Sequence, residues 1–252
     1  MRCSTPTAEP DRADSLPPSR PGRAGLSGPG GSVAGDGRSR GEGGVGLRVA
    51  LGFRPHTGWS TVVAVGRVGD GIRVVHRGQV KIAPAELPRQ VYHAAREVDV
   101  AAGAELVARA VAAVGELAQA GVGAAIAQLR ASGQHPVAAG LPVAGTAIPA
   151  ELTRILASHA LLHAAEGDLY CRALAESADR HGLALTLVPA RELAALAARE
   201  LRLGEGALRG RLAAIGRELG PPWRKDEMDA TLAAVLALAA APGDPAPDRS
   251  PR

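Results

Sequence analysis

The chain has 252 residues, of which 46% are hydrophobic and 21% charged, and its formal net charge at pH 7 is +4. The apolar fraction is sufficient for a hydrophobic core, which excludes a wholly disordered chain. No run of residues approaches the roughly 18 uninterrupted apolar positions of a membrane span, so we expect no membrane association. The two cysteines, Cys3 and Cys171, are too few for a disulfide framework or a cysteine-rich zinc site, and we expect a reducing, cytoplasmic setting.

The basic excess of the chain is weak evidence for a nucleic-acid partner. All but two of the basic residues are arginines, the exceptions being Lys81 and Lys225, and this bias together with abundant Ala, Gly and Pro is typical of a GC-rich genome. Between Leu47 and Ala241 there are 21 Lys and Arg against 18 Asp and Glu. A net of +3 over that span is not by itself a nucleic-acid footprint. Aromatic residues make up only 2% of the chain, which argues against a stacking platform for single strands.

Both ends of the chain differ in composition from its middle. Gly, Pro and Ser occupy 23 of the first 46 positions, and residues 242–252 are similarly rich in Pro. Such segments bury too little apolar surface to offset their ordering entropy, so we expect disordered tails at 1–46 and 242–252. Residues 1–46 also allow a second interpretation, in which translation starts near Val45 or Val49.

Strands come first in the remaining part. Apolar and β-branched runs predict strands at 47–53, 59–65 and 72–82, and the Gly69-Asp70-Gly71 turn favours an antiparallel meander. A helix is expected over 101–132, with Gly121 and Gly123 as candidate breaks, followed by a strand at 135–140. Pro149 is expected to open a long helix that reaches about Gly182. A strand at 183–188 and helices at 190–203, 205–219 and 225–240 complete one α/β domain over 47–241, a mixed five-stranded sheet with helices on both faces.

Three short motifs, taken in this order, resemble a known family. Leu51-Gly52-Phe53-Arg54-Pro55 resembles the opening strand of the RuvC-type Holliday-junction resolvases, within the ribonuclease H-like superfamily. Residues 188–193 resemble the segment after the fifth strand of that family, and residues 226–233 resemble its closing helix, which begins with Asp-x-x-Asp-Ala. The resemblance extends over about 47–240 and implies a ribonuclease H-like fold. It also implies a nucleic-acid partner, either branched or double-stranded.

Catalysis in that family is two-metal hydrolysis of phosphodiesters, and this sequence departs from the residues that the resemblance implies. The family holds Mg²⁺ ions with carboxylates from the first strand, the fourth strand and the last helix. Here the first-strand position is Arg54, and residues 134–150 contain no Asp or Glu. Only the last-helix pair, Asp226 and Asp229, matches, so the resemblance supports at most a doubtful Mg²⁺ site at these two residues.

Arg54 suggests what replaced the missing carboxylates. In this fold the end of the first strand faces the start of the last helix, so we expect the Arg54 guanidinium to pair with Asp226 or Asp229 and to supply the charge of the metal. Two alternatives remain open. Asp226 is also placed to cap the helix or to complement its dipole, and the aspartate pair is also suited to residual metal binding.

Other polar residues are further candidates for chemistry. His159, His163 and Glu166 lie at i, i+4 and i+7 of one expected helix and therefore share a face, which suits a zinc site or, equally, a polar ridge. Glu166 is the best internal candidate for a relocated catalytic carboxylate. His56, which follows Arg54, is a candidate acid or base. Arg54, Arg224 and Lys225 are candidate phosphate-binding residues, together with the loose basic set completed by Arg211 and Arg217 beside Trp223.

Three functions are consistent with these patterns. The first is a resolvase-like, nucleic-acid-associated protein with a degenerate two-metal centre and little or no cleavage activity. The second is an active metal-dependent endonuclease that uses Asp226, Asp229 and a displaced Glu166, with His56 or His163 assisting. The third is a non-enzymatic scaffold that forms a homodimer through its Ala- and Leu-rich helices.

Overall fold

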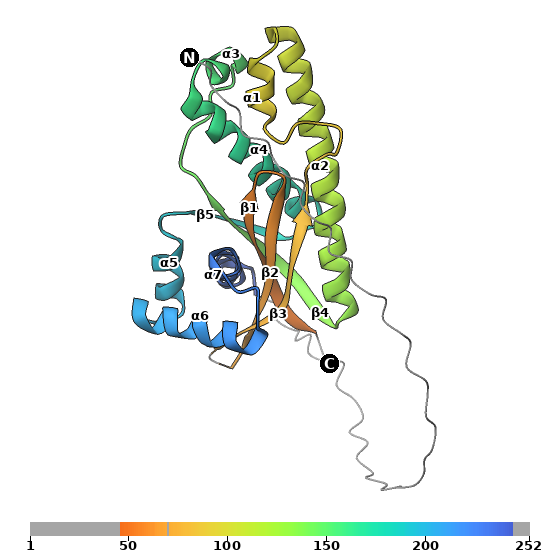
Figure 1. Ribbon diagram of the computed structural model, residues 1–252. Helices are drawn as coiled ribbons and strands as arrows, with labels where there is room; N and C mark the ends of the chain where they lie inside the picture. Colours follow the sequence, from red (N-terminus) through yellow and green to blue (C-terminus); the bar gives the residue numbers. More distant parts are fainter. Residues whose placement is uncertain (1–45, 70, 244–252) are drawn as a thin grey trace, which may run out of the picture. The chain divides into compact units, whose positions relative to one another are not determined.

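The computed structural model describes residues 46–69 and 71–243. The two expected tails, 1–46 and 242–252, therefore fall almost wholly outside the described residues, as does Asp70 of the expected turn. Five strands form one sheet, β1 (Leu47–His56), β2 (Trp59–Val68), β3 (Gly71–Lys81), β4 (Gln134–Val143) and β5 (Ala184–Pro189) (Figure 1). Their order is β3-β2-β1-β4-β5; β1, β2 and β3 are antiparallel, whereas β4 and β5 run parallel to β1. The predicted mixed five-stranded sheet, which begins with an antiparallel meander, is thus confirmed.

Helices cover both faces of this sheet (Figure 1). On one face lie α2 (Val100–Ala131) and α4 (His159–Arg180), with the short α1 (Val91–Arg96) and α3 (Leu152–Leu156) beside them. On the other face lies α7 (Lys225–Ala240), flanked by α5 (Leu193–Glu200) and α6 (Glu205–Leu219). The described part of the chain is therefore a three-layer arrangement of helix, sheet and helix.

Side-chain alternation along the strands builds a separate core on each face. Val49, Leu51 and Phe53 of β1 are fully buried against α2 and α4, in a cluster that includes Val114 and Tyr170. The intervening residues face α7, where the buried cluster consists mainly of small side chains: Ala50, Val63, Val65, Ala138, Ala230, Ala234, Val235 and Ala237. Because successive strand residues point to opposite faces, Arg54 and His56 share the α7 side with Ala50.

Two paired glycines allow α7 to lie directly on the sheet. Gly52 of β1 pairs with Gly140 of β4. A Cβ atom at Gly52 would lie 1.7 Å from the carbonyl oxygen of Ala230, and one at Gly140 would lie 2.1 Å from that of Ala233. Only glycine permits such a close approach of helix and strand backbones. This contact brings the start of α7 to the carboxyl end of β1, which sets the geometry of the site described below.

Several predicted boundaries differ from the structure. The helix expected to start at Pro149 begins instead as α3 at Leu152. It is interrupted at Ala157, and a second helix, α4, begins at His159. The Ser158 hydroxyl caps α4 by accepting a hydrogen bond from the Leu161 amide. The predicted 190–203 helix is shorter, and α1 was not predicted. Gly121 and Gly123 do not interrupt α2. A Cβ at Gly121 would lie 2.3 Å from Val80 Cγ1, so this glycine permits close packing on β3 and does not break the helix.

One described helix, α2, is long and apolar enough to cross a membrane by length and composition alone. Polar residues are spread along its 32 residues, so it contains no long uninterrupted apolar run. One side of α2 lies in the core, where Ala110, Val114, Ala118 and Val122 are fully buried against the sheet and α4. A helix that packs in a protein core can have the same length and apolar composition as a membrane-spanning helix.

Candidate active-site edge of the sheet

The carboxyl end of β1 and the first turns of α7 bring Arg54 and the predicted aspartate pair together. The Nε atom of Arg54 lies 3.3 Å from Asp229 Oδ2 and 4.0 Å from Asp226 Oδ1. All three side chains are partly buried, and that of Asp229 is 16% exposed. The Nε contacts lack hydrogen-bond geometry, so they are ion pairs. The predicted pairing of Arg54 with these carboxylates is present in the structure.

His56 occupies the other side of Asp226. Its Nε2 atom lies 3.0 Å from Asp226 Oδ2, and its ring stacks on Trp59 with 4.2 Å between centroids and 12° between planes. His56 and Trp59 face each other across the β1–β2 hairpin. Stacking on a large aromatic side chain restricts the rotation of the imidazole, so Asp226 is held between two nitrogen groups from β1.

Two basic residues at the start of α7, Arg224 and Lys225, complete the group of charged residues around the two aspartates. Lys225 Nζ donates a 2.7 Å hydrogen bond to Asp229 Oδ2, and the Lys225 side chain is 77% exposed. Arg224 is the exposed N-cap residue of α7, and its backbone amide donates a 2.7 Å hydrogen bond to Glu227 Oε2. The Glu227 carboxylate therefore caps the N-terminus of α7 by accepting this hydrogen bond. The alternative of Asp226 as the cap is wrong, although Asp226 lies in the first turn, where a negative charge complements the helix dipole.

The donor set at this edge does not fit two-metal chemistry. The described contacts gather two carboxylates, Asp226 and Asp229, and each already faces a nitrogen cation or an imidazole. The position two residues beyond Gly140 on β4, on the same face of the strand, is Pro142, which offers no oxygen side chain. Paired Mg²⁺ ions require several free carboxylate oxygens, and a guanidinium at contact distance repels them.

A hollow of about 190 Å³ opens beside Arg54, between the ends of β1 and β4 and the helix α4. Its walls include Thr146 after β4 and His163, Asp168 and Cys171 of α4. Burial, with the Asp168 carboxylate nearby as a smaller cause, raises the pKa of the Cys171 thiol to about 11. The thiolate is therefore scarce at neutral pH, which excludes Cys171 as an activated nucleophile in this hollow.

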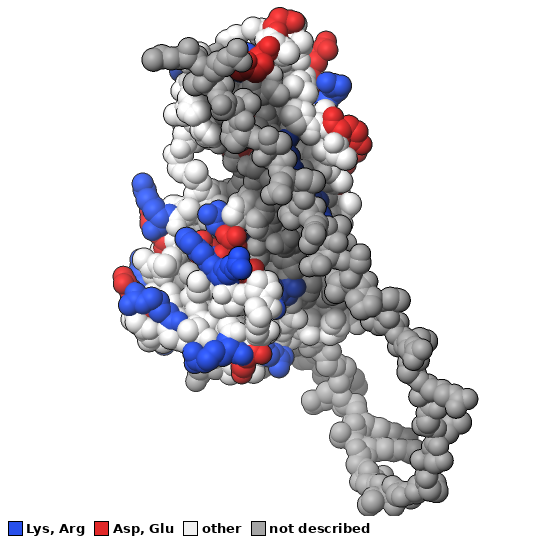
Figure 2. All heavy atoms as spheres, in the orientation of Figure 1, with Lys and Arg blue, Asp and Glu red and all other residues white. Residues whose placement is uncertain are grey.

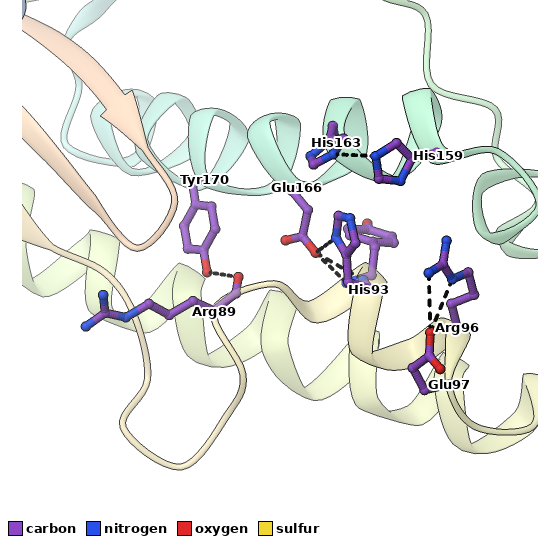
Figure 3. A network of polar contacts seen from close by, with 9 residues as sticks. Arg89, His93, Arg96, Glu97, His159, His163, Glu166 and Tyr170 are labelled. Atoms are coloured by element: carbon purple, nitrogen blue, oxygen red, sulfur yellow. Dashed lines mark hydrogen bonds and ion pairs between the residues drawn. The ribbon is translucent and has the colours of Figure 1, made fainter. Parts of the chain in front are cut away.

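Glu166 lies elsewhere and does not join the aspartate pair. Its side chain is 4% exposed, and its Oε1 atom accepts hydrogen bonds from the backbone amides of Tyr92 (2.7 Å) and His93 (3.3 Å) at the start of α1 (Figure 3). His93 Nδ1 lies 3.4 Å from the same oxygen. Unlike its neighbours His163, Ala164 and Gly167, Glu166 is absent from the hollow beside Arg54. The carboxylate expected to complete the nuclease site serves instead to join α1 to α4.

Two tyrosines flank this carboxylate. The Tyr170 hydroxyl donates a 2.7 Å hydrogen bond to the Arg89 carbonyl (Figure 3). Burial, assisted by the Glu166 charge, raises the pKa of Tyr170 to about 12. Burial likewise raises the pKa of Tyr92, with Asp168 and Glu166 contributing in the same direction. Both hydroxyls therefore stay protonated near neutral pH, and that of Tyr170 keeps its hydrogen bond to Arg89.

The loose basic set around Trp223 is not one cluster. Arg211 and Arg217 of α6 line a separate hollow with Ile72 of β3. Trp223 packs into the apolar cluster of α5, α6 and α7, where Gly216 leaves room for its ring. Among the expected phosphate contacts, only Arg54, Arg224 and Lys225 belong to the edge that holds Asp226 and Asp229.

Two features of the site were not predicted from the sequence. The pairing of Lys225 with Asp229 was readable as an i, i+4 spacing, which places both residues on one helix face. The position of His93 beside Glu166 had no comparable signal. Its helix α1 has only six residues, too few for an apolar period, and 73 residues separate it from Glu166.

Two solved structures are similar to the chain at low sequence identity. No protein-family model and no curated protein sequence matches the chain. Among solved structures, Thermus thermophilus RuvC is similar with a TM-score of 0.43 and 15% identity, over 74% of this chain and 90% of that one. T. thermophilus RuvC in complex with a Holliday junction substrate is similar with a TM-score of 0.42 and 18% identity, over the same shares.

Proposed function

We propose that this protein binds double-stranded or branched nucleic acid at the edge formed by β1, β4 and α7, with little or no cleavage of it. One observation carries the proposal. The Arg54 guanidinium contacts both Asp226 and Asp229, the two residues that match metal-binding carboxylates of the resembled family. Nucleic acid as the ligand class comes from the resemblance of residues 51–55, 188–193 and 226–233 to resolvase motifs.

The charge balance of this edge supports binding without a metal. Arg54 and Lys225 offset the two aspartates, and the exposed Arg224 adds one positive charge. A site made of carboxylates alone repels phosphate unless divalent cations neutralise it, whereas fixed side-chain cations need no such partner. We therefore expect nucleic-acid binding that does not depend on Mg²⁺.

The surface around the site is consistent with a phosphate backbone as partner. A second hollow of about 680 Å³ is lined by Thr57, which follows the end of β1, and by Arg89, His93 and Glu97. Figure 2 shows Lys and Arg side chains gathered over the part formed by α5, α6 and α7, with Asp and Glu interspersed. A chain of phosphates that follows this edge would meet Arg89, Arg54 and Lys225.

Fluorescence anisotropy of the full chain with labelled four-way junction, duplex and single-stranded DNA tests the proposal. We expect binding of the junction and the duplex that is equal in EDTA and in Mg²⁺ and that weakens as salt rises, because neutralised phosphates release counterions. Replacing both Arg224 and Lys225 by Ala should weaken binding about 10-fold and lower the salt slope by about 1–2. Arg130→Ala is the matched control, since Arg130 is exposed at the end of α2, by the opposite edge of the sheet where β4 begins.

Cleavage assays separate the proposal from an active nuclease. Mg²⁺- or Mn²⁺-stimulated nicking of the junction that disappears in Asp229→Asn would support the active enzyme and contradict the proposal. The contacts disfavour this alternative, since Glu166 Oε1 is bound to α1. Absence of both binding and cleavage, together with a stable dimer by light scattering, would support the scaffold.

A further inference from the structure

Three imidazoles converge where α1 meets the start of α4. His159 and His163 lie one turn apart on α4, with their Nε2 atoms 3.1 Å from each other (Figure 3). His93 of α1 faces both, and its ring centroid is 4.8 Å from that of His163 and 5.9 Å from that of His159. One nitrogen from each ring lies within 4.8 Å of the others, and the two α4 histidines are exposed. This group is called the triple-histidine cluster below.

The spacing suits a small tetrahedral cation. A Zn²⁺ ion with Zn–N bonds of about 2.0–2.1 Å and tetrahedral angles places its ligand nitrogens about 3.3 Å apart. The separation of His159 and His163 is close to that value without any movement. A rotation of the His93 ring, at the exposed junction of α1 and α4, brings in the third nitrogen. Neutral imidazole is a preferred ligand of zinc.

Glu166 gives the cluster a supporting carboxylate. Its Oε1 atom faces His93 Nδ1, which leaves Nε2 of His93 as the metal-binding nitrogen. Carboxylates in this position orient metal-binding histidines and increase their basicity. The second oxygen, Oε2, is buried and has no hydrogen-bond partner among the described residues. A buried negative charge with a free lone pair is costly unless a positive charge lies near.

We propose that the triple-histidine cluster is a Zn²⁺ site with three imidazole ligands, a supporting Glu166, and a fourth position open to water or an external ligand. The site is separate from the acidic pair, because it uses neither Asp226 nor Asp229. It borders two hollows, since His163 lines the one beside Arg54 and His93 lines the one beside Arg89. Bound zinc would add a link between α1 and α4, which Glu166 and the packing of Tyr92 against Leu162 and Ala165 already join.

Metal analysis of the untagged full chain tests this site. After equilibration with Zn²⁺ and dialysis, we expect one equivalent of zinc per chain by plasma mass spectrometry. With Co²⁺ as a probe, we expect the intense visible absorption of a four-coordinate ion. His159→Gln and His163→Gln should each weaken Zn²⁺ binding at least 10-fold in competition with a chromophoric chelator. Both residues are exposed, so these variants should fold normally.

Matched variants make the result decisive. His135→Gln, which alters an exposed histidine on β4, and Asp229→Asn should keep full zinc binding. Glu166→Gln should weaken binding about 10–100-fold, as is typical when a supporting carboxylate is lost. Absence of stoichiometric zinc, a weak six-coordinate Co²⁺ spectrum, or unchanged binding in His159→Gln and His163→Gln would each overturn the proposal. None of these results depends on whether the chain binds nucleic acid.

Discussion

Arg54 balances the charge of the two aspartates at the end of the sheet. Its guanidinium contacts both aspartates of α7 from a strand position that faces the helix. Asp226 and Asp229 lie three residues apart on one helix face, so their charges repel each other when Arg54 is removed. The ion pair is partly buried, which makes it stronger than a surface pair and weaker than a fully desolvated one.

A double-mutant cycle measures this pairing. We expect Arg54→Ala and Asp229→Asn each to lower the free energy of unfolding, with a coupling energy of about 0.5–2 kcal/mol between them. Chemical denaturation of the two single variants and the double variant gives the value. A coupling near zero would mean that the contact contributes nothing to stability. Arg73→Ala, at an exposed position of β3, is the control and should show no coupling to Asp229→Asn.

Replacing the cation by a carboxylate tests whether Arg54 supplies the charge of a metal. Arg54→Asp puts three carboxylates at the edge. In EDTA we expect the free energy of unfolding to fall by about 2 kcal/mol or more, because an unpaired charge cluster is left partly buried. Millimolar Mg²⁺ should restore part of that stability in the variant and leave the unaltered chain unchanged. Thermal unfolding with and without Mg²⁺ gives both values. An equal Mg²⁺ effect on both proteins would contradict the prediction.

Cys171 illustrates how burial controls reactivity. The pKa of its thiol is raised to about 11, from an ordinary value near 9, mainly by burial. We expect its reaction with a thiol reagent at pH 8 to be at least 10-fold slower than in the denatured chain, because the thiolate is the reacting species. A Cys3→Ser background isolates the signal of Cys171. Equal rates in the native and denatured states would show that the thiol is freely accessible.

At the scale of elements, the contact between α7 and the sheet positions the site. Gly52 and Gly140 lie side by side under α7, and any side chain there meets helix backbone at 1.7 and 2.1 Å. A β-carbon cannot be accommodated by a rotamer change, so the helix itself must move. The first two turns of α7 carry the aspartates, and a shift of the helix therefore separates them from Arg54 and His56.

Alanine substitutions test this contact. Gly52→Ala should lower the free energy of unfolding by about 3 kcal/mol or more, the range of severe overpacking. Gly210→Ala is the matched control: Gly210 is exposed within α6, and its Cβ would meet nothing within 4 Å. In Gly210→Ala the free energy of unfolding should rise by about 0.5–1 kcal/mol, because alanine has the higher helix propensity. Urea denaturation compares the two, and similar effects would contradict the packing account.

At the scale of the whole molecule, raised pKa values predict the response to alkali. The folded state keeps the protons of Tyr170, up to about pH 12, and of Cys171, up to about pH 11, whereas the unfolded chain releases them near 10 and 9. Between those values the unfolded state binds fewer protons, so stability falls as pH rises. We expect the contribution of these groups to be complete below about pH 9 and lost by about pH 12.

Denaturation curves at pH 8, 10 and 11.5 measure this loss. Tyr170→Phe should make the decline shallower, because the variant has no hydroxyl to ionise at this position. At pH 8, Tyr170→Phe should also lower the free energy of unfolding by about 1 kcal/mol, because the hydrogen bond to the Arg89 carbonyl is missing. An unchanged slope in Tyr170→Phe would exclude Tyr170 as a source of the pH dependence.

Periodicity in the sequence predicted most of the elements. The bounds of α6 and α7 agree with the predicted 205–219 and 225–240, because apolar residues at helical spacing and nearby Gly and Pro mark both ends. The break between α3 and α4 has no comparable signal, because no Gly or Pro occurs near Ala157 and Ser158, where it lies. The capping contact of Ser158 with the Leu161 amide starts α4 at His159.

Residue order along the chain established that an arginine, Arg54, follows the first apolar run and that no Asp or Glu occurs over 134–150. Only the tertiary structure decided which groups meet. Glu166 and His163 share a helix but face different neighbours, and His93 joins them from a six-residue helix far away in the chain. Spacing along one element specifies a face, whereas contact between elements depends on how closely and at what angle the helices pack.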